Sequence, residues 1–160
     1  MMRGVEILPG EGVALAKVGE HRDVVEGRVG PPVHPGRHSR AVYPTEPMLV
    51  LTYAEDETVE IVELGYGVER QAYFDGVQLT YRFMDEVVAD LERKGYRADP
   101  TGIGFRFEPG FAIFSMASLW ARDLDPQATE DDPREIVEGV SVAPYAYFDD
   151  ASEEEDEDEG

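Results

Sequence analysis

The hydrophobic pattern of the chain predicts one well-defined helix in its second half. Apolar side chains recur at every fourth position, and two more lie beside them on the same helical face: Phe83, Val87 and Leu91, with Met84 and Val88. Gly95 follows, and glycine readily adopts the positive φ that ends many helices. The spacing therefore predicts an amphipathic helix over residues 84–94 that buries one broad apolar face.

A weaker helical pattern lies in the first half. Asp23-Val24-Val25-Glu26 is similar to Glu86-Val87-Val88-Ala89, which lies 63 residues later within the helix described above. The segment ends at Gly30, as the later one ends at Gly95. Its β-branched valines and Gly27 lower the helix propensity, so we expect a less regular helix here.

Short segments of strand-like composition follow each predicted helix. They cover residues 40–43, 48–53 and 58–64 in the first half, and 103–107, 111–116 and 136–142 in the second. Because turn-forming residues separate them, both sets are typical of antiparallel meanders. Glu55-Asp56-Glu57 is expected to form one of the hairpin turns. Residues 121–133, rich in Asp, Glu and Pro, are inserted before the last strand and are expected to form a loop.

Both halves also open alike. Strands at residues 5–8 and 71–74 lead through tight turns into Gly12-Val13-Ala14-Leu15 and Gly76-Val77-Gln78-Leu79, 64 residues apart. Matching turns, helices and strands of the two halves thus lie a nearly constant number of residues apart, which indicates an internal repeat. A chance self-alignment of a small α+β chain is the alternative.

These patterns predict an α+β fold of two tandem β-α-β-β-β repeats, in which an antiparallel sheet has helices packed on one face. We expect the repeats to span residues 5–70 and 71–148. Neither unit could bury its helix face alone, so we expect both to share the core of a single domain, residues 1–148.

Composition narrows the class of protein. The 160 residues include 35 Asp and Glu against 14 Lys and Arg, a formal charge of −21, which disfavours binding to nucleic-acid phosphates. The absence of cysteine excludes disulfides and thiolate sites. No run approaches the roughly 20 apolar residues of a membrane span, and Glu6 and Pro9-Gly10 interrupt the N-terminal apolar run before it resembles a signal peptide. We expect a cytoplasmic protein with no membrane role.

The acidity lies partly in a tail and partly on the body. Residues 149–160 hold nine acidic residues and too little apolar surface to fold, so we expect a disordered acidic tail. Residues 1–148 still carry a formal charge of −12, with only Lys17 and Lys94 against twelve arginines. Such a surface is typical of halophilic proteins, whose carboxylates repel one another less in concentrated salt. A GC-rich genome is the alternative explanation.

Residues 12–32 carry a weak family resemblance. They combine a strand, a glycine, a helix with a central valine, and the sequence Val29-Gly30-Pro31-Pro32. This pattern resembles the unit duplicated in β-lactamase inhibitor proteins and BamE-type outer-membrane assembly lipoproteins, with Val29 where Leu-Gly-x-Pro has its leucine. A family of small uncharacterised bacterial and archaeal proteins is similar over both repeats. The lipoprotein signal peptide and lipidation cysteine are missing, so the resemblance implies the fold alone.

No motif indicates a catalytic, metal or cofactor site. His34 and His38 share one loop and His21 is a possible third ligand, but Arg37 and Arg40 would repel a metal ion. The serines lack the Gly-x-Ser-x-Gly motif, the glycine pairs lack a phosphate-binding pattern, and carboxylates are too abundant for a pair to be diagnostic. We expect no catalytic residues, no metal and no cofactor.

Aromatic residues suggest a binding surface instead. The chain has eight tyrosines, more than one core requires, and a sheet covered by helices on one face leaves the other face open. Tyrosine, tryptophan and arginine on such a face have the composition of protein interfaces. We expect the partner-binding residues to be Tyr43, Arg106, Trp120, Tyr145 and Tyr147. Half-buried tyrosines at strand edges are the alternative.

The sequence therefore predicts a non-catalytic protein-binding module, of inhibitor or immunity type, whose partner is another protein. A small enzyme or ligand-binding protein is one alternative, and it would require a pocket in which His21, His34 or His38 converge. An acidic mimic of nucleic acid is another, and it would require carboxylates at phosphate-like spacing. Partner identity and oligomeric state leave no signal in the sequence.

Overall fold

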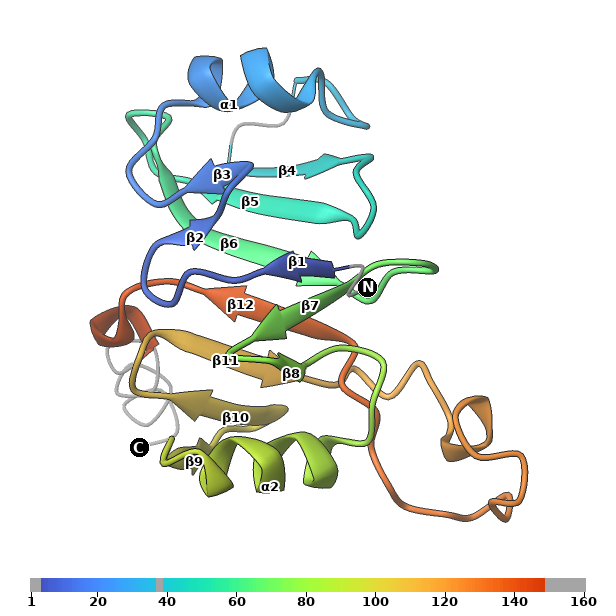
Figure 1. Ribbon diagram of the computed structural model, residues 1–160. Helices are drawn as coiled ribbons and strands as arrows, with labels where there is room; N and C mark the ends of the chain where they lie inside the picture. Colours follow the sequence, from blue (N-terminus) through green and yellow to red (C-terminus); the bar gives the residue numbers. More distant parts are fainter. Residues whose placement is uncertain (1–3, 37–38, 149–160) are drawn as a thin grey trace, which may run out of the picture.

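The computed structural model of the protein describes residues 4–36 and 39–148 (Figure 1). The tail at residues 149–160 lies outside the described residues, as do Arg37 and His38. Within the described part, strands predominate and the helices are short. In chain order the elements are β1 (Gly4–Glu6), β2 (Gly12–Val13), β3 (Ala16–Lys17), α1 (Arg22–Val29), β4 (Arg40–Tyr43), β5 (Leu49–Tyr53), β6 (Val59–Gly65), β7 (Gln71–Phe74), β8 (Val77–Gln78), α2 (Met84–Arg93), β9 (Ala98–Pro100), β10 (Gly104–Phe107), β11 (Phe111–Phe114), the 3-10 helix η1 (Ala121–Asp123) and β12 (Gly139–Val142).

Seven strands form one antiparallel sheet in the order β4-β5-β6-β12-β11-β10-β9. The expected meanders are confirmed, since β4 to β6 are neighbours in chain order, as are β10 to β12. β6 and β12 pair at the centre and join the two sets (Figure 1). β9 was not expected from the sequence; it pairs with β10 and forms one edge of the sheet.

One face of this sheet, here called the covered face, forms the floor of the main core. Two cross-strand rows of side chains run across it: Ala41, Leu51, Val62, Val142, Phe111 and Phe107; and Tyr43, Leu49, Leu64, Val140, Ile113 and Phe105. All of them except Phe105 are buried. Because successive side chains on a strand point to opposite faces, the residues between them lie on the other face.

Two small sheets and the helices α1 and α2 contribute to the layer over the covered face. A three-stranded sheet, β1-β7-β8, and the β2-β3 hairpin complete the strand content (Figure 1). Val25 of α1 and Val87 and Leu91 of α2 belong to the same buried cluster as the covered-face rows. The mixed α+β class with a large antiparallel sheet is therefore confirmed. The sequence pattern did not predict how much of the covering layer is made of strands.

The opening strand pairs with a segment far along the chain. β1 runs parallel to β7, with Val5 opposite Ala72, and an isolated antiparallel bridge joins Leu8 to Gly12. Residues 12–17 form their own hairpin, β2-β3. The N–H of Ile7 donates to the carbonyl of Tyr73 at 2.9 Å. This partner is distant in sequence, so no local pattern specifies the pairing.

The two predicted helices are present. α2 buries Met84, Val87 and Leu91, and Gly95 follows it with φ of 99°. α1 is two residues shorter than α2, and Val25 is its only buried residue. No helix in the described part of the chain is long and apolar enough to cross a membrane.

Candidate functional site

The second face of the seven-stranded sheet, here called the open face, carries side chains that remain partly exposed. One cross-strand row crosses all seven strands: Val42, Val50, Glu63, Ser141, Ala112, Arg106 and Asp99. Every member of this row is only half-buried. The rows on the covered face are almost entirely buried, which is what a packed second layer produces. The open face is therefore accessible to a partner.

Phe114 borders two shallow hollows on the open face. Its ring lies over Gly139 on the neighbouring strand, where an added Cβ would come within 2.3 Å of the ring. The first hollow has a volume of about 320 Å³ and is lined in part by Ile61, Ala112 and Ser141. The second has a volume of about 400 Å³ and is lined in part by Met48, Val50 and Tyr66. Glycine at position 139 thus lets an aromatic ring pack flat on the sheet surface.

Arg106 and Tyr145 form a small polar cluster beside the first hollow. The Arg106 guanidinium lies 5.7 Å from the centroid of the Tyr145 ring, and its Nη1 donates to the carbonyl of Phe148 at 3.2 Å. The Tyr145 hydroxyl donates to Asp99 at 3.1 Å, and Asp99 is the cross-strand neighbour of Arg106. These contacts hold the turn at residues 145–148 against this end of the sheet.

Four large apolar side chains remain exposed at the borders of the hollows. Ile103 and Tyr147 line the first hollow and are 49% and 38% exposed. Met48 and Tyr66 line the second and are 49% and 42% exposed. Together they add exposed apolar surface to the borders of the open face.

Glu138 anchors the chain next to the second hollow, which it helps to line. Its buried carboxylate accepts hydrogen bonds from the hydroxyls of Ser115 and Ser118, and from the N–H groups of Met116 at 3.2 Å and Ser118 at 2.9 Å. Burial by itself would raise the pKa of Glu138. The hydrogen bonds outweigh burial and hold the pKa below its usual value. The charged carboxylate thus fixes the point after β11 at which the chain leaves the sheet.

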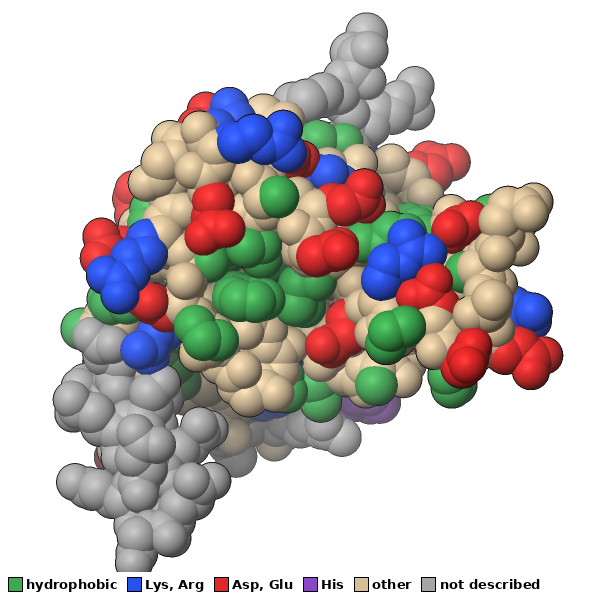
Figure 2. All heavy atoms as spheres, turned by 90° about the horizontal axis from the view of Figure 1, so that it is seen from below, with side chains coloured by type: hydrophobic (Ala, Val, Ile, Leu, Met, Phe, Trp, Pro, Cys, Tyr) green, Lys and Arg blue, Asp and Glu red, His purple; other side chains and the backbone are tan. Residues whose placement is uncertain are grey.

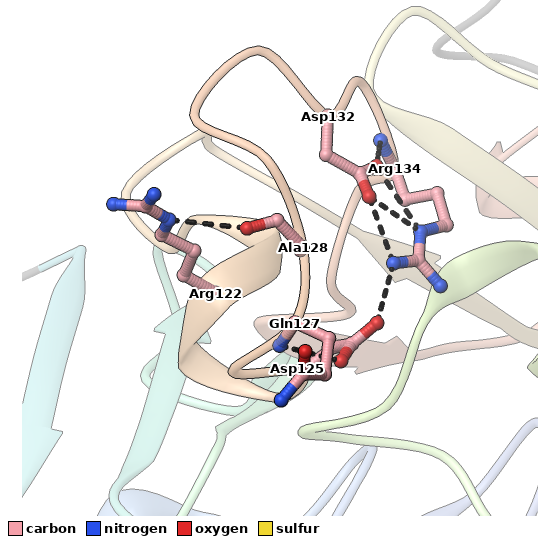
Figure 3. Close-up of polar contacts among 6 residues, drawn as sticks. All are labelled: Arg122, Asp125, Gln127, Ala128, Asp132 and Arg134. Carbon is pink, nitrogen blue, oxygen red and sulfur yellow. Dashed lines mark hydrogen bonds and ion pairs between the residues drawn. The ribbon is translucent and has the colours of Figure 1, made fainter.

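The inserted loop, residues 116–135, projects from the sheet and contains η1 (Figure 1). Its ends are held by side chains, as Figure 3 shows: Arg134 donates to Asp132 at 2.8 Å and to Asp125 at 3.0 Å. Arg122 donates to the carbonyl of Ala128 at 3.2 Å. The hydrogen bonds from Arg134 hold the pKa values of the Asp125 and Asp132 carboxyl groups below their usual range. The loop expected at residues 121–133 is confirmed within this longer segment, apart from the short η1, and it is internally bonded.

A small hydrophobic cluster supports the base of this loop. Ala121 and Ala128 pack with Phe83 and Ile136, separately from the main core. Arg134 covers the Phe83 ring, with its guanidinium 4.0 Å from the ring centroid. The largest apolar side chains of the loop, Trp120 and Met116, lie outside this cluster and are 68% and 64% exposed.

The structure separates the five expected partner-binding residues. Arg106, Tyr145 and Tyr147 lie together at one end of the open face. Trp120 lies on the projecting loop. The expectation for Tyr43 is wrong, because this side chain is fully buried on the covered face and its hydroxyl bonds to Glu26. A tyrosine in a strand is exposed or buried according to which face its position points to, and composition does not report that.

Sequence reasoning missed Met48, Tyr66, Ile103 and Phe114 on the open face. A signal for Phe114 was present, since it alternates along β11 with Phe111 and Ile113, which are buried. Alternation thus assigns it to the face opposite theirs. The other three lie at strand ends, where alternation gives no reliable assignment.

The histidines give no support to a metal centre. His21 begins α1, and its ring Nδ1 accepts the N–H of Asp23 at 3.1 Å. His34 is exposed. His38, the third histidine named in the sequence analysis, lies outside the described residues. Among the residues that the structure describes, no group of three or more His, Asp or Glu could hold a metal ion.

The chain was also compared with known proteins. No family model, curated protein or solved structure matched it.

Proposed function

We propose that this protein is a non-catalytic protein-binding module that contacts another protein through the open face and the loop at residues 116–135. The observation that carries the proposal is an accessible sheet face bordered by exposed Ile103, Tyr147, Met48 and Tyr66. Methionine, aromatic residues and arginine are enriched in protein interfaces. An inhibitor or immunity role is the form of binding that agrees with the fold resemblance of residues 12–32.

The site is also preorganised. Arg106 is held by the carbonyl of Phe148 and the ring of Tyr145, and the base of the loop is fixed by Glu138 and Arg134. Side chains that are already ordered lose less conformational entropy when a partner binds. Trp120 then extends the contact area beyond the sheet, and tryptophan is among the residues that contribute most to binding energy.

The proposal is tested by affinity capture from the cells that make the protein. The double variant Met48→Glu/Ile103→Glu places two charges on the open face at exposed positions, so the fold should tolerate them. Val24→Glu/Ala14→Glu is the matched control, since both residues are exposed and neither lines the open-face hollows. We expect one partner to be captured by the wild type and the control but not by the open-face variant. Equal capture by all three proteins, or no specific capture, would contradict the proposal.

We also propose the two tandem β-α-β-β-β repeats, related by an approximate two-fold axis between β6 and β12. The register of the sheet supports this. Tyr43 pairs with Leu49 as Phe107 pairs with Phe111. Leu49 in turn pairs with Leu64 as Phe111 pairs with Val142. When β4, β5 and β6 are matched with β10, β11 and β12, the cross-strand pairs of one copy have counterparts in the other, except for Tyr53 with Val59, which follows a register shift in β5.

Backbone hydrogen bonds at the start of each helix support the same relationship. The N–H of Arg22 donates to the carbonyl of Glu57 at 2.9 Å, and the N–H of Met84 donates to that of Glu135 at 2.8 Å. The preceding residues form matching isolated bridges, His21 with Thr58 and Phe83 with Ile136. Each helix is therefore joined in the same way to the residues just before the last strand of its meander.

The inserted loop interrupts this correspondence. A short turn containing Glu55 to Glu57 joins β5 to β6, with the N–H of Ala54 bonded to the carbonyl of Thr58. Residues 116–135 occupy the matching connection between β11 and β12. Since the sheet does not need so long a connection, the insertion supports a role for the loop in binding.

The acidic body is proposed to be a salt-adapted surface. Residues 1–148 carry a formal charge of −12, and most arginines already pair with carboxylates, for example Arg28 with Glu20 at 2.9 Å and Arg82 with Asp90 at 2.9 Å. The remaining carboxylates repel one another in dilute salt.

A further inference from the structure

A second surface lies on the opposite side of the sheet from the open face. α2 and the return limb of the inserted loop form a groove of about 330 Å³, with a mainly apolar floor made of Met84, Val88, Ala89, Phe105 and Pro133. Phe105 belongs to a covered-face row, whereas its neighbour Arg106 belongs to the open face. The groove and the open face are therefore separate surfaces.

The groove keeps its apolar side chains partly exposed. Val88 and Phe105 are half-buried and pack on the edge of the main core, while Ala89 and Pro133 are exposed. Figure 2, which views the molecule from the α2 side, shows hydrophobic side chains gathered near the middle of this face, with acidic side chains around them. Filling the groove would remove this apolar surface from water.

The rim of the groove is acidic. Asp85, Glu92 and Glu135 line it and are all exposed. None of the three forms an ion pair with a cation of the residues that the structure describes. Nearby Asp90, in contrast, pairs with both Arg82 and Arg93.

Arg134, the one cation among the described residues that line the groove, is already neutralised. Arg134 is bound by Asp132 at 2.8 Å and by Asp125 at 3.0 Å, the contacts drawn in Figure 3. The same bonds fix the return limb that forms one wall of the groove. The rim thus presents three carboxylates without a balancing charge around an apolar floor.

We propose that this groove docks a basic amphipathic segment of another protein, which inserts an apolar side chain between Val88 and Phe105 and places Lys or Arg next to the acidic rim. Charge complementarity selects this occupant. A second copy of the chain is disfavoured, because each copy carries a formal charge of −21. An apolar groove that receives one face of a helix is a common mode of peptide recognition.

The inference is independent of the open face and is tested with the full chain. The probe is a fluorescein-labelled amphipathic peptide of about 14 leucine and lysine residues, and its affinity is measured by fluorescence anisotropy in about 0.5 M KCl, which screens distant charges. We expect the triple variant Asp85→Asn/Glu92→Gln/Glu135→Gln to weaken binding by at least about tenfold, as three lost charge contacts imply. Circular dichroism checks that each variant is folded.

A charge-matched control separates docking from general attraction. Glu11→Gln/Glu69→Gln/Glu108→Gln removes three exposed charges away from the groove, and we expect it to change the affinity less than about threefold. A second pair of variants tests the floor: Ala89→Lys should weaken binding by at least about tenfold, and Ala14→Lys, at another exposed alanine, should not. Equal weakening by both triple variants, wild-type affinity in Ala89→Lys, or no binding of the peptide to the wild type would overturn the proposal. The open-face variant Met48→Glu/Ile103→Glu should bind the peptide as the wild type does. Peptide binding at the groove can then be judged separately from partner binding at the open face.

Discussion

The hydroxyl of Tyr43 donates a hydrogen bond of 2.7 Å to the carboxylate of Glu26 and thereby joins β4 to α1. Tyr43 is fully buried, and the hydroxyl of Tyr53 lies 2.8 Å from its own. Burial, with the bonds to Tyr53 and Glu26, raises the pKa of Tyr43 well above its ordinary value, so it stays neutral. Because Val25 is the only buried residue of α1, this polar contact adds to the few interactions that hold the helix on the sheet.

Removal of the Tyr43 hydroxyl should therefore loosen α1. We expect Tyr43→Phe to lower the free energy of unfolding by about 1 to 2 kcal/mol, because Glu26 and Tyr53 lose a buried partner. Tyr96→Phe is the matched control, since its hydroxyl bonds to exposed Asp75, and should cost less than about 0.5 kcal/mol. Urea denaturation measures both. Hydrogen exchange should also be faster in α1 of the Tyr43 variant, and similar costs for the two variants would contradict this role.

Leu91 tests whether the two halves share one core. Its side chain is fully buried in the cluster that contains residues of both meanders, so Leu91→Ala should cost about 2 to 5 kcal/mol. Val25→Ala should cost less, because valine loses fewer methyl groups. Both variants should unfold in a single transition by circular dichroism. Two resolved transitions would instead indicate that the proposed repeats fold separately.

Glu138 should make stability dependent on acid pH. Its pKa in the folded protein is lower than the reference value of 4.5, so its contribution is fully present above about pH 4.5 and disappears as the pH falls through the folded pKa. We expect Glu138→Ala to cost about 1.5 to 3 kcal/mol at pH 7, since the hydrogen bonds are made to a charged group. Glu138→Gln should cost less and should flatten the loss of stability below pH 4.5 in urea titrations. If Glu138→Gln lost stability below pH 4.5 as steeply as the wild type, this carboxylate would not be the source of the acid dependence.

Salt should stabilise the protein if its acidic surface is salt-adapted. The screening length falls from about 10 Å in 0.1 M salt to about 3 Å in 1 M salt, which weakens repulsion among the carboxylates. We expect the urea midpoint to rise steadily from about 0.1 to about 2 M KCl. The variant Glu11→Gln/Glu69→Gln/Glu108→Gln should rise less steeply, because it carries fewer repelling charges. A midpoint that does not change with KCl would exclude the halophilic interpretation.

Local patterns predicted the main elements well. α2 follows from its fourfold apolar spacing and Gly95, and β4 has the predicted bounds. Periodicity failed where the structure depends on distant partners. β9 has no strand-like pattern in Ala98-Asp99-Pro100, and it forms because β10 offers an edge.

The candidate site was predicted in part. A sheet with one free face was the correct expectation, and Arg106 and Tyr147 lie on it. Tyr43 was misplaced because residue type alone does not specify a face. The groove beside α2 was not predicted at all, since Val88 and Phe105 are neighbours only after α2 packs beside β10.

The sequence by itself determined the types and order of both α-helices and of the meander strands, the inserted loop and the excess of negative charge, because periodicity, turn residues and composition are local properties. Only the tertiary structure decided the parallel pairing of β1 with β7 and the central pairing of β6 with β12. It also gave Gly19 and Tyr81 a positive φ, of 90° and 58°, and their N–H groups donate equivalent 2.8 Å hydrogen bonds to the carbonyls of Val59 and Val137. These features arise from contacts between distant segments, and such contacts override the local preference of a tyrosine for negative φ.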